Sequence, residues 1–306
     1  HGINAGKLRR YVDLQNITDL FRIAHGCLTS FSLMHTLRPQ VVFSKGGFVS
    51  CPVVWAAWLH RIPVIIHESD ITPGLANKLS LPFCDTICFS FPETHEKLPQ
   101  GKATYTGIPV RETLLSGDKE RGKAISGFTD AKPIILVIGG SQGSETINRA
   151  IRTGLETLLE TFNICHICGR GKMNADLAVH HGYRQCEYVR QDLAHFLAMA
   201  DLVVSRAGAT MLFELLELKK ANLLIPLSLQ ASRGDQILNA RSFEKRGFSQ
   251  VLPEQNLDPA TLIAGIRNAY EQRQTMRAAM KAGERVNGVQ NVLEVIERYI
   301  SAPSIT

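Results

Sequence analysis

Residues 200–240 constrain the fold most, because they combine a strand, a glycine turn, a helix and a second strand. A β-branched run at Leu202–Val204 ends at a Ser-Arg-Ala-Gly turn, a helix-favouring segment runs from Ala209 to Lys220, and a second apolar run spans Leu223–Pro226. Such a turn directs unpaired backbone N–H groups and the positive end of a helix dipole at one point. The stretch therefore predicts an α/β domain with a site suited to phosphate.

Glu214 lies one turn into this helix, among leucine and phenylalanine residues. An acidic group in an apolar segment costs stability unless it has a partner or faces a site. A ribose diol is such a partner, because a carboxylate can accept hydrogen bonds from both hydroxyls. The alternative is a solvated helix face, and the adjacent glycine turn favours the ribose interpretation.

A second unit of the same kind starts at Ile134–Ile138, which predicts a buried strand. A glycine turn at 139–144 and an amphipathic helix from Glu145 to Glu160 follow it. Small residues, inward N–H groups and the Ser141 hydroxyl suit a phosphate. The spacing matches neither G-x-G-x-x-G nor a P-loop, which disfavours nicotinamide-dependent and ATP-hydrolysing enzymes. Further strands are expected at 162–167 and 187–189.

The length of 306 residues, with 44% hydrophobic and 20% charged residues, predicts two domains with large cores. The net charge is +6, and basic residues are in excess near the start: Lys7, Arg9, Arg10, Arg22 and Arg38. Anionic lipid, nucleic acid and a phosphorylated substrate would all suit this excess, and charge alone does not choose among them. No apolar run is long enough to span a bilayer and no signal peptide is evident, so we expect a cytoplasmic protein.

The seven cysteines are odd in number and lie mostly in apolar runs, which favours reduced, buried thiols over a disulfide framework. Cys165 and Cys168 have the spacing of half a zinc site. They lie in a strand-like run, where residues three apart face opposite sides, and no second ligand pair follows. We therefore expect no metal and no other cofactor.

The first part of the chain predicts interior strands at 39–44 and 62–67, with a short helix at 48–60 between them. A doubly wound domain normally begins with its own strand and glycine loop, and neither precedes these elements. Before them, apolar residues recur at helical spacing, and we expect most of them to pack on the sheet while a basic rim faces a membrane. They are Ile17, Leu20, Phe21, Ala24, Leu28, Phe31 and Leu37.

Polar and glycine-rich loops follow both of these strands. Gly46 and Gly47 follow the first and allow a ligand to approach the backbone closely, whereas His67 and Glu68 follow the second. Open α/β sheets bind ligands at this edge. His67 and Glu68 are therefore candidates for a catalytic or acceptor-binding role, and a hydrogen-bonded loop pair is an equally good alternative.

The runs SRAGATMLFE, LLIPL and SRGDQILNA resemble the donor half of the MurG family. These are peripheral membrane enzymes that add N-acetylglucosamine to lipid I in peptidoglycan synthesis, and the resemblance spans nearly the whole chain. It implies two Rossmann-like domains facing a cleft, the glycosyltransferase B-type fold, with the first domain N-terminally incomplete. Residues 1–110 would form an acceptor and membrane-side domain, residues 111–290 a UDP-sugar-binding domain, and the final helix, in 291–306, would pack back on the first.

The resemblance also implies roles for individual residues. Arg111 would lie beside the donor diphosphate, where a guanidinium can donate two bonds, and a surface ion pair is its alternative role. The main chain at Val189 would contact uracil, and Gln236 the N-acetylglucosamine. The donor-binding set is Arg111, Ser141, Gln142, Asn148, Val189, Ala209, Thr210, Glu214, Gln236 and Asn239; the acceptor-side set is Gly46, Gly47 and Asn77; the catalytic candidates are His67 and Glu68.

The implied reaction is attack of the muramyl 4-hydroxyl of lipid I on C1 of UDP-N-acetylglucosamine, with inversion, at the cytoplasmic face of the cell membrane. The product would be lipid II, for cell wall biogenesis, cell shape and cell division. The implied partners are UDP-N-acetylglucosamine, undecaprenyl-pyrophosphoryl-muramyl-pentapeptide (lipid I) and an anionic membrane surface, with no nucleic acid. A related transferase with another lipid acceptor and a non-catalytic nucleotide-sugar-binding subunit are the alternatives, and the general base stays unassigned.

Overall fold

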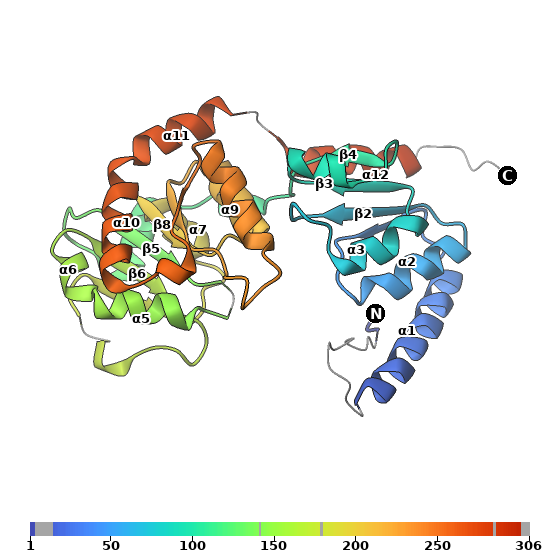
Figure 1. Ribbon diagram of the computed structural model, residues 1–306, viewed down its shortest axis with the longest axis horizontal. Helices are drawn as coiled ribbons and strands as arrows, with labels where there is room; N and C mark the ends of the chain where they lie inside the picture. Colours follow the sequence, from blue (N-terminus) through green and yellow to red (C-terminus); the bar gives the residue numbers. More distant parts are fainter. Residues whose placement is uncertain (4–14, 141, 178–179, 284–285, 301–306) are drawn as a thin grey trace. The chain divides into compact units, whose positions relative to one another are not determined.

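The computed structural model describes residues 1–3, 15–140, 142–177, 180–283 and 286–300, with side chains from residue 24 onward in the first helix. The chain divides into a first unit, His1–Pro109 with Val286–Thr306, and a second unit, Val110–Arg285 (Figure 1). In the described residues each unit contains one sheet, and every strand pairing is parallel.

The first unit is built on a four-stranded sheet in the order β1-β2-β3-β4. Its two central strands, β2 and β3, are buried along their whole length, as expected where helices cover both faces of a parallel sheet. The elements are α1 (Gln15–Leu37), β1 (Val42–Ser44), α2 (Ser50–Leu59), β2 (Val64–Glu68), α3 (Leu75–Ser80), β3 (Thr86–Phe89), β4 (Ala103–Tyr105) and α12 (Gly288–Ile300), with short 3-10 helices at Leu81–Phe83 and Pro92–Lys97.

Alternate residues of β2 and β3 face two different helical layers. Ile66 and Ile87 belong to the cluster that includes residues of α2, whereas Ile65 and Cys88 pack with Val295 of α12. Figure 1 shows α12 on one side of this sheet and α2 and α3 on the other. The chain thus returns to its first sheet at its end, and α12 closes one face of that sheet.

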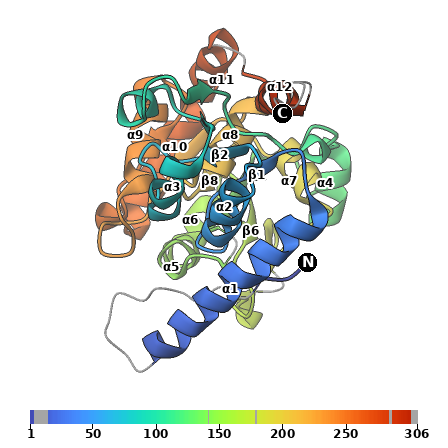
Figure 2. The ribbon, with the colours of Figure 1, turned by 90° about the vertical axis from the view of Figure 1, so that its right-hand side faces the viewer.

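α1 packs mainly against α2 (Figure 2), and its Met34 joins the cluster that α2 forms with the sheet. Its buried face carries small residues, with Ser30 fully buried beside Met34. We expected most of the apolar residues at helical spacing to pack on the sheet, and for Leu28, Phe31 and Leu37 this was wrong: these side chains are 72%, 47% and 52% exposed. Small residues let two helices approach closely, and Leu28, Phe31 and Leu37 lie on the other face of α1. Ala24 is also exposed, and the side chains of Ile17, Leu20 and Phe21 lie outside the described set.

The second unit is built on a six-stranded sheet in the order β10-β9-β8-β5-β6-β7. Its strands are β5 (Ile134–Ile138), β6 (Asn163–Ile167), β7 (Tyr183–Cys186), β8 (Leu202–Ser205), β9 (Asn222–Leu224) and β10 (Gln250–Val251). Its helices are α4 (Lys119–Ser126), α5 (Glu145–Thr153), α6 (Leu155–Leu159), α7 (Leu193–Met199), α8 (Ala209–Glu217), α9 (Asp235–Lys245), α10 (Pro259–Glu271) and α11 (Arg273–Ala282), with 3-10 helices at Glu112–Leu114, Ala175–Leu177 and Glu254–Asn256.

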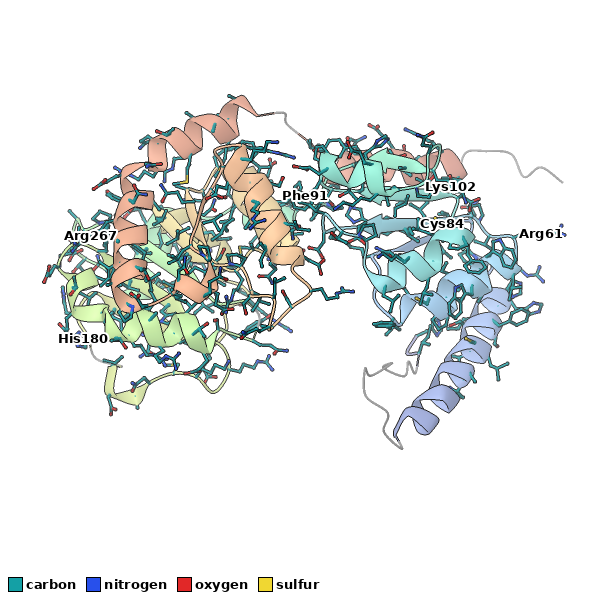
Figure 3. All side chains as sticks on the ribbon, in the orientation of Figure 1. Arg61, Cys84, Phe91, Lys102, His180 and Arg267 are labelled. Carbon is teal, nitrogen blue, oxygen red and sulfur yellow. The ribbon has the colours of Figure 1, made fainter. Side chains whose placement is uncertain are left out.

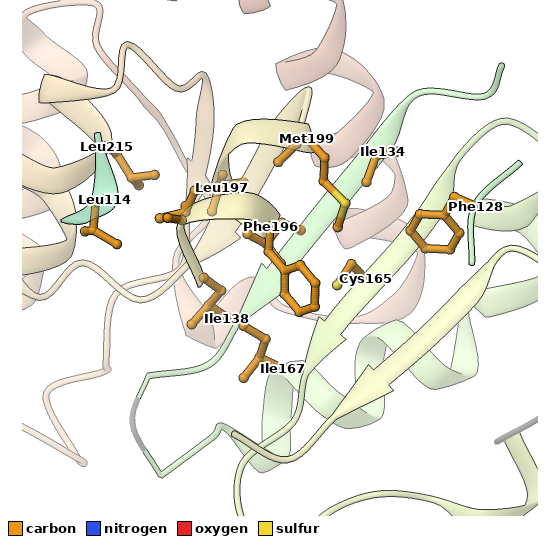
Figure 4. Packing of buried hydrophobic residues seen from close by; sticks show 14 residues of the cluster. Leu114, Phe128, Ile134, Ile138, Cys165, Ile167, Phe196, Leu197, Met199 and Leu215 are labelled. Carbon is orange, nitrogen blue, oxygen red and sulfur yellow. The ribbon is translucent and has the colours of Figure 1, made fainter. Parts of the chain in front are cut away.

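One face of this sheet packs against α7. Figure 4 shows Phe196 and Met199 of α7 next to residues of β5 and β6, including Ile134 and Cys165. Burying each such side chain contributes about 1.5–3 kcal/mol relative to leaving it exposed. Cys165 behaves here as a small apolar residue, and burial raises the pKa of its thiol. All seven cysteines are free thiols, as expected.

The strand order places a switch point between β5 and β8. The chain adds β6 and β7 on one side of β5, then crosses to add β8, β9 and β10 on the other. Crossovers to opposite sides separate the loops that leave β5 and β8, and ligands of open α/β sheets bind in that opening. The two glycine turns singled out in the sequence are the segments that follow β5 and β8.

Two sequence-based boundaries in this unit were wrong. The edge strand lies at Tyr183–Cys186 instead of 187–189, because only alternate residues, Tyr183 and Gln185, are fully buried and its apolar signal is weak. The helix expected over 145–160 breaks into α5 and α6 at Gly154. A methyl group at Gly154 would lie 3.0 Å from Cδ1 of Ile263, so α10 packs closely at the break.

Candidate donor and acceptor sites

The turn after β5 is locked by backbone packing. Gly143 has φ +70°, and a methyl group there would lie 1.9 Å from the carbonyl oxygen of Cys168. In return, a methyl group at Gly169 would lie 2.4 Å from the carbonyl oxygen of Gln142. The turns after β5 and β6 therefore interlock, and only glycine fits at both contacts. Gln142 is exposed on this turn, and Ser141 lies outside the described residues.

The helix that follows, α5, begins with a side-chain N-cap at Ser144. The Ser144 hydroxyl accepts from the N–H of Ile147, and Ser144 Oγ also receives a hydrogen bond of 2.6 Å from Nη2 of Arg206. One turn later, Asn148 is fully buried, and its Nδ2 donates to the carbonyl of Cys168 at 2.9 Å. Asn148 therefore faces the interior of the domain in this structure and supports the interlocked turns from behind.

The turn after β8 is open by comparison. Gly208 precedes α8 with φ −69°, no side chain caps the helix, and a methyl group at Gly208 would meet no atom within 4 Å. Ala209 is buried and Thr210 is exposed at the start of the helix. Asn239, fully buried in α9, donates to the carbonyl of Ala207 and so holds the turn from behind. The space beside Gly208 is thus open at the start of α8, where the first N–H groups of a helix have no partner within the helix.

Glu214 and Arg111, both predicted to bind the donor, pair with each other. Nε and Nη2 of Arg111 lie 3.0 and 2.9 Å from Oε1 of Glu214, whose side chain is 2% exposed. Burial raises the pKa of the Glu214 carboxyl, and the charge of Arg111 offsets part of this effect. The Arg111 side chain remains 57% exposed. The pair places a cation at the surface beside α8 and a carboxylate just beneath it.

Sequence analysis missed a buried network between the two glycine turns. Arg206, directly after β8, donates from Nη1 to the carbonyl of Ile225 and forms an ion pair with Glu254 through Nη2. Glu254 also accepts from the Thr146 hydroxyl and from the N–H of Ser228. Burial raises the pKa of the Glu254 carboxyl, but these donors, Arg206 first, lower it below the usual range. An arginine directly after a buried strand was a usable signal for a buried partner.

The remaining donor candidates lie on loops of this unit. Val189 is half-buried and packs against the cluster under α7. Gln236, at the start of α9, accepts from the N–H of Leu227 through Oε1 at 3.2 Å, which leaves its amide nitrogen as the donor group.

A cavity of about 990 Å³ opens beside these loops, and none of the donor candidates that the structure describes lines it. Thr146 and Glu254 border it on the side of the turns, and Arg233 and Arg241 of the α9 region lie on its wall. The cavity is therefore a neighbour of the switch-point site and does not coincide with it.

In the first unit His67 belongs to β2 rather than to a loop, and it is fully buried. Its Nε2 donates to the carbonyl of Gly107 at 2.9 Å, because a carbonyl only accepts. Burial lowers the pKa of His67 to about 4, although this hydrogen bond opposes the shift. His67 is thus a neutral, buried side chain whose Nε2 is bonded to Gly107, and its catalytic role stays a prediction.

Glu68, the last residue of β2, organises the loop that follows. Its carboxylate accepts from the N–H groups of Asp70 and Gly74 and from Nδ2 of Asn77, at 2.8–3.0 Å. Burial raises the pKa of this carboxyl, and the three donors offset part of the shift. All these bonds leave Glu68 poorly placed to take a proton from an acceptor.

Asn77 connects this loop to the glycine turn after β1. Its Oδ1 is buried without a hydrogen-bond partner and faces Gly46, where a methyl group would lie 3.1 Å away. Gly46 and Gly47 have φ of +86° and +93°, so both need glycine. The structure thus brings the three acceptor-side candidates together at the carboxyl edge of the first sheet.

Two parallel α/β units, the second with glycine turns on both sides of its switch point, define the architecture of a B-type glycosyltransferase. Residues 1–89 match the glycosyltransferase family 28 N-terminal domain, and residues 134–296 match the glycosyltransferase family 28 C-terminal domain. The chain belongs to glycosyltransferase family 28 and, within it, to the MurG family.

Curated relatives carry the name UDP-N-acetylglucosamine–N-acetylmuramyl-(pentapeptide) pyrophosphoryl-undecaprenol N-acetylglucosamine transferase. The protein from Clostridium tetani is 50% identical over 299 residues, 98% of this chain and 84% of its own. The protein from Clostridium perfringens (strain SM101 / Type A) is 47% identical over 97% of this chain and 84% of its own.

Solved structures share the fold at lower identity. MurG of Acinetobacter baumannii is 24% identical with a TM-score of 0.72, over 96% of this chain and 83% of its own. UDP-GlcNAc 2-epimerase of Neisseria meningitidis, bound to UDP-GlcNAc, is 14% identical with a TM-score of 0.66, over 95% of this chain and 84% of its own.

Proposed function

We propose that this protein transfers N-acetylglucosamine from UDP-N-acetylglucosamine to the muramyl 4-hydroxyl of lipid I, giving lipid II with inversion at the sugar carbon. The names of relatives up to 50% identical support the donor and the acceptor. The structural observation that carries the proposal is the pair of glycine turns at the switch point, with a buried carboxylate one turn into α8.

The two domains divide the work in this proposal. Residues 111–290 bind the donor: the N–H groups of the turns after β5 and β8 receive the diphosphate, and Glu214 accepts from the ribose hydroxyls. Arg111 either moves from Glu214 toward the phosphates or bridges the Glu214 carboxylate and the diphosphate, since its side chain is exposed and has five N–H donors. The main chain at Val189 contacts uracil, and Gln236 donates to the N-acetylglucosamine. Asn148 and Asn239 shape the two turns from behind.

Residues 1–110 bind the acceptor, with the final helix completing that domain. Gly46 and Gly47 allow the lipid-linked substrate to approach the backbone, and the unpartnered Oδ1 of Asn77 is an acceptor for one of its hydroxyl or amide groups. Because His67 is neutral and buried and the Glu68 carboxylate already accepts three hydrogen bonds, we propose that they position this loop and that the general base lies elsewhere.

An exposed apolar surface on the first unit supports peripheral attachment to the cytoplasmic face of the cell membrane. Leu28 and Phe31 of α1 and Trp58 and Leu59 of α2 are exposed, and His60 connects the two helices by packing on Phe31 with ring centroids 4.4 Å apart. Arg61 extends outward next to this surface (Figure 3). Apolar side chains with a basic rim suit an anionic lipid surface. No helix of the described residues is both long and apolar enough to cross a membrane.

Vesicle co-sedimentation tests the attachment. We expect the chain to bind vesicles containing an anionic lipid, and Leu28→Glu with Trp58→Glu to bind less, because both introduced carboxylates would face the bilayer. Leu229→Glu, at a 71% exposed leucine of the second unit, is the control. Equal binding by all three proteins would contradict the proposal.

Calorimetry with UDP-N-acetylglucosamine tests the donor site first. We expect binding by this chain, weaker binding of UDP-glucose, and a loss of about 10- to 100-fold in Glu214→Ala, as for removal of a hydrogen bond to a charged group. Glu217→Ala, at the end of the same helix, is the control. A folded chain that binds no uridine nucleotide would overturn the donor-site assignment. Donor binding without lipid I turnover would overturn the proposal that lipid I is the acceptor.

A further inference from the structure

A chain of buried polar groups lies behind the turn that follows β5. Asn148, His166 and Tyr183 come from α5, β6 and β7, and their side chains are at most 5% exposed. Oδ1 of Asn148 lies 2.9 Å from Nε2 of His166, and Nδ1 of His166 lies 2.9 Å from the hydroxyl of Tyr183. Buried polar groups of this kind are costly unless every member is satisfied, so their arrangement is specific.

The carbonyl of Cys168 sets the direction of every hydrogen bond in the chain. A carbonyl only accepts, so the Asn148 amide must turn Nδ2 toward it and Oδ1 toward the ring of His166. His166 must then carry its proton on Nε2 and accept at Nδ1 from the Tyr183 hydroxyl. Burial lowers the pKa of His166 to about 3, and the charge of Arg152 adds to this shift, so the ring is neutral, as the arrangement requires.

The same carbonyl lies against the glycine turn. Its oxygen would be 1.9 Å from a methyl group at Gly143, so the Cα of Gly143 rests directly on the Cys168 peptide. A rotation of this peptide would therefore move the turn. The chain from Tyr183 through His166 to Asn148 thus ends on the backbone that shapes the turn after β5.

We propose that His166 and Tyr183 are positioning residues for donor binding: they orient Asn148, which fixes the Cys168 peptide and so the N–H groups that receive the donor diphosphate. This inference rests on the proposed function, because it takes the turn after β5 as the diphosphate site. It assigns no contact between either side chain and the substrate.

Two amide replacements of His166 separate the roles of its nitrogens. The amide nitrogen of glutamine reaches the place of Nε2, so His166→Gln keeps the donor to Asn148. The shorter amide of asparagine overlays Nδ1, so His166→Asn keeps a partner for Tyr183 and loses Asn148. We expect KM for UDP-N-acetylglucosamine to stay within about 3-fold in His166→Gln and to rise at least about 10-fold in His166→Asn, with a smaller change in kcat.

Tyr183→Phe is a second, milder variant. Without the hydroxyl, Nδ1 of His166 has no donor, and the ring can place its proton there, which turns a lone pair toward Oδ1 of Asn148. We expect KM to rise by about 3- to 10-fold. Competition by uridine, which lacks phosphates, should be unchanged in all variants, whereas competition by UDP should weaken in His166→Asn and Tyr183→Phe.

The outcomes distinguish this inference from the proposed function. If wild-type protein binds no UDP-N-acetylglucosamine, the donor site itself fails. If wild type binds and His166→Asn and His166→Gln have equal KM values, or if uridine and UDP weaken together, the positioning role is overturned. Should His166→Asn fail to fold, the Tyr183→Phe result for UDP against uridine decides alone.

Discussion

The two glycine turns of the second sheet look alike in sequence and differ in structure. After β5, Gly139 and Gly143 are enclosed: methyl groups there would lie 2.4 Å from the nitrogen of Ser144 and 1.9 Å from the carbonyl oxygen of Cys168. After β8, Gly208 has an ordinary backbone conformation and open space around the place of a side chain. The turn after β5 needs glycine for its own packing, whereas the turn after β8 leaves room for a ligand.

Glycine turns at a switch point therefore serve two separate purposes. In the enclosed turn, the absence of side chains lets two backbone segments touch and sets a fixed curve of N–H groups. In the open turn, it leaves the start of α8 accessible. Stability and donor affinity should therefore respond in opposite ways to a methyl group in the two places.

Gly143→Ala should have the largest effect. The added methyl group overlaps the Cys168 carbonyl, and φ +70° is unfavourable for alanine, so both the backbone and the interlocked turn must move. We expect the free energy of unfolding to fall by about 3 kcal/mol or more, measured by urea denaturation.

Gly171→Ala is the matched control for that variant. Gly171 has φ +67°, close to that of Gly143, but no atom lies within 4 Å of the place of its methyl group. The loss should be about 1 kcal/mol, from backbone conformation alone. Equal losses in the two variants would show that conformation, not contact with Cys168, makes glycine necessary.

Glu254→Gln should have the next largest effect, because this carboxylate joins the two turns through Arg206. Glutamine keeps an acceptor but leaves a buried guanidinium without its counter-charge, and we expect a loss of about 2 kcal/mol at pH 7. The pKa of Glu254 is lowered in the folded state, so its stabilisation is present above the unfolded value of about 4.3 and is lost as pH falls through the folded value.

Denaturation of both proteins between pH 7 and pH 3 measures this dependence. The difference between wild type and Glu254→Gln should shrink below about pH 4. Glu120→Gln, which removes an exposed carboxylate of α4 paired with Lys123, should change stability little at any pH. A wild-type advantage that persists at the lowest pH would contradict the role of the ionised carboxylate.

The elements that form the two sheets were largely predictable, because buried parallel strands are apolar runs that end at glycine or polar residues. The direction of polar side chains was not. Asn148, Asn239 and His67 were chosen as contacts for ligands, and the structure has all three fully buried and bonded to loop carbonyls or neighbouring side chains. A polar residue type near a loop indicates a polar partner, but not on which side of the loop that partner lies.

Ion-pair partners that are distant in sequence could not be predicted either. Arg206 and Glu254 are 48 residues apart, and nothing in either segment points to the other. The same limit applies to α1, whose helical spacing was correct and whose outward face was taken for its inward one. A period of 3.6 residues marks a stripe, and the size of the residues facing the neighbouring helix decides which stripe is buried.

Gly208→Ala should have the smallest effect on stability. It tests whether the turn after β8 is open, in contrast to the enclosed turn after β5. Alanine accepts φ −69°, and the only expected cost is that of a poorer residue before a helix, about 0.5 kcal/mol. Its methyl group would nevertheless stand at the start of α8, and we expect affinity for UDP-N-acetylglucosamine to fall about 10-fold, measured by calorimetry. A large loss of stability would mean that both turns are structural. Unchanged stability together with unchanged affinity would move the donor phosphates away from α8 and leave the turn after β5 as their site.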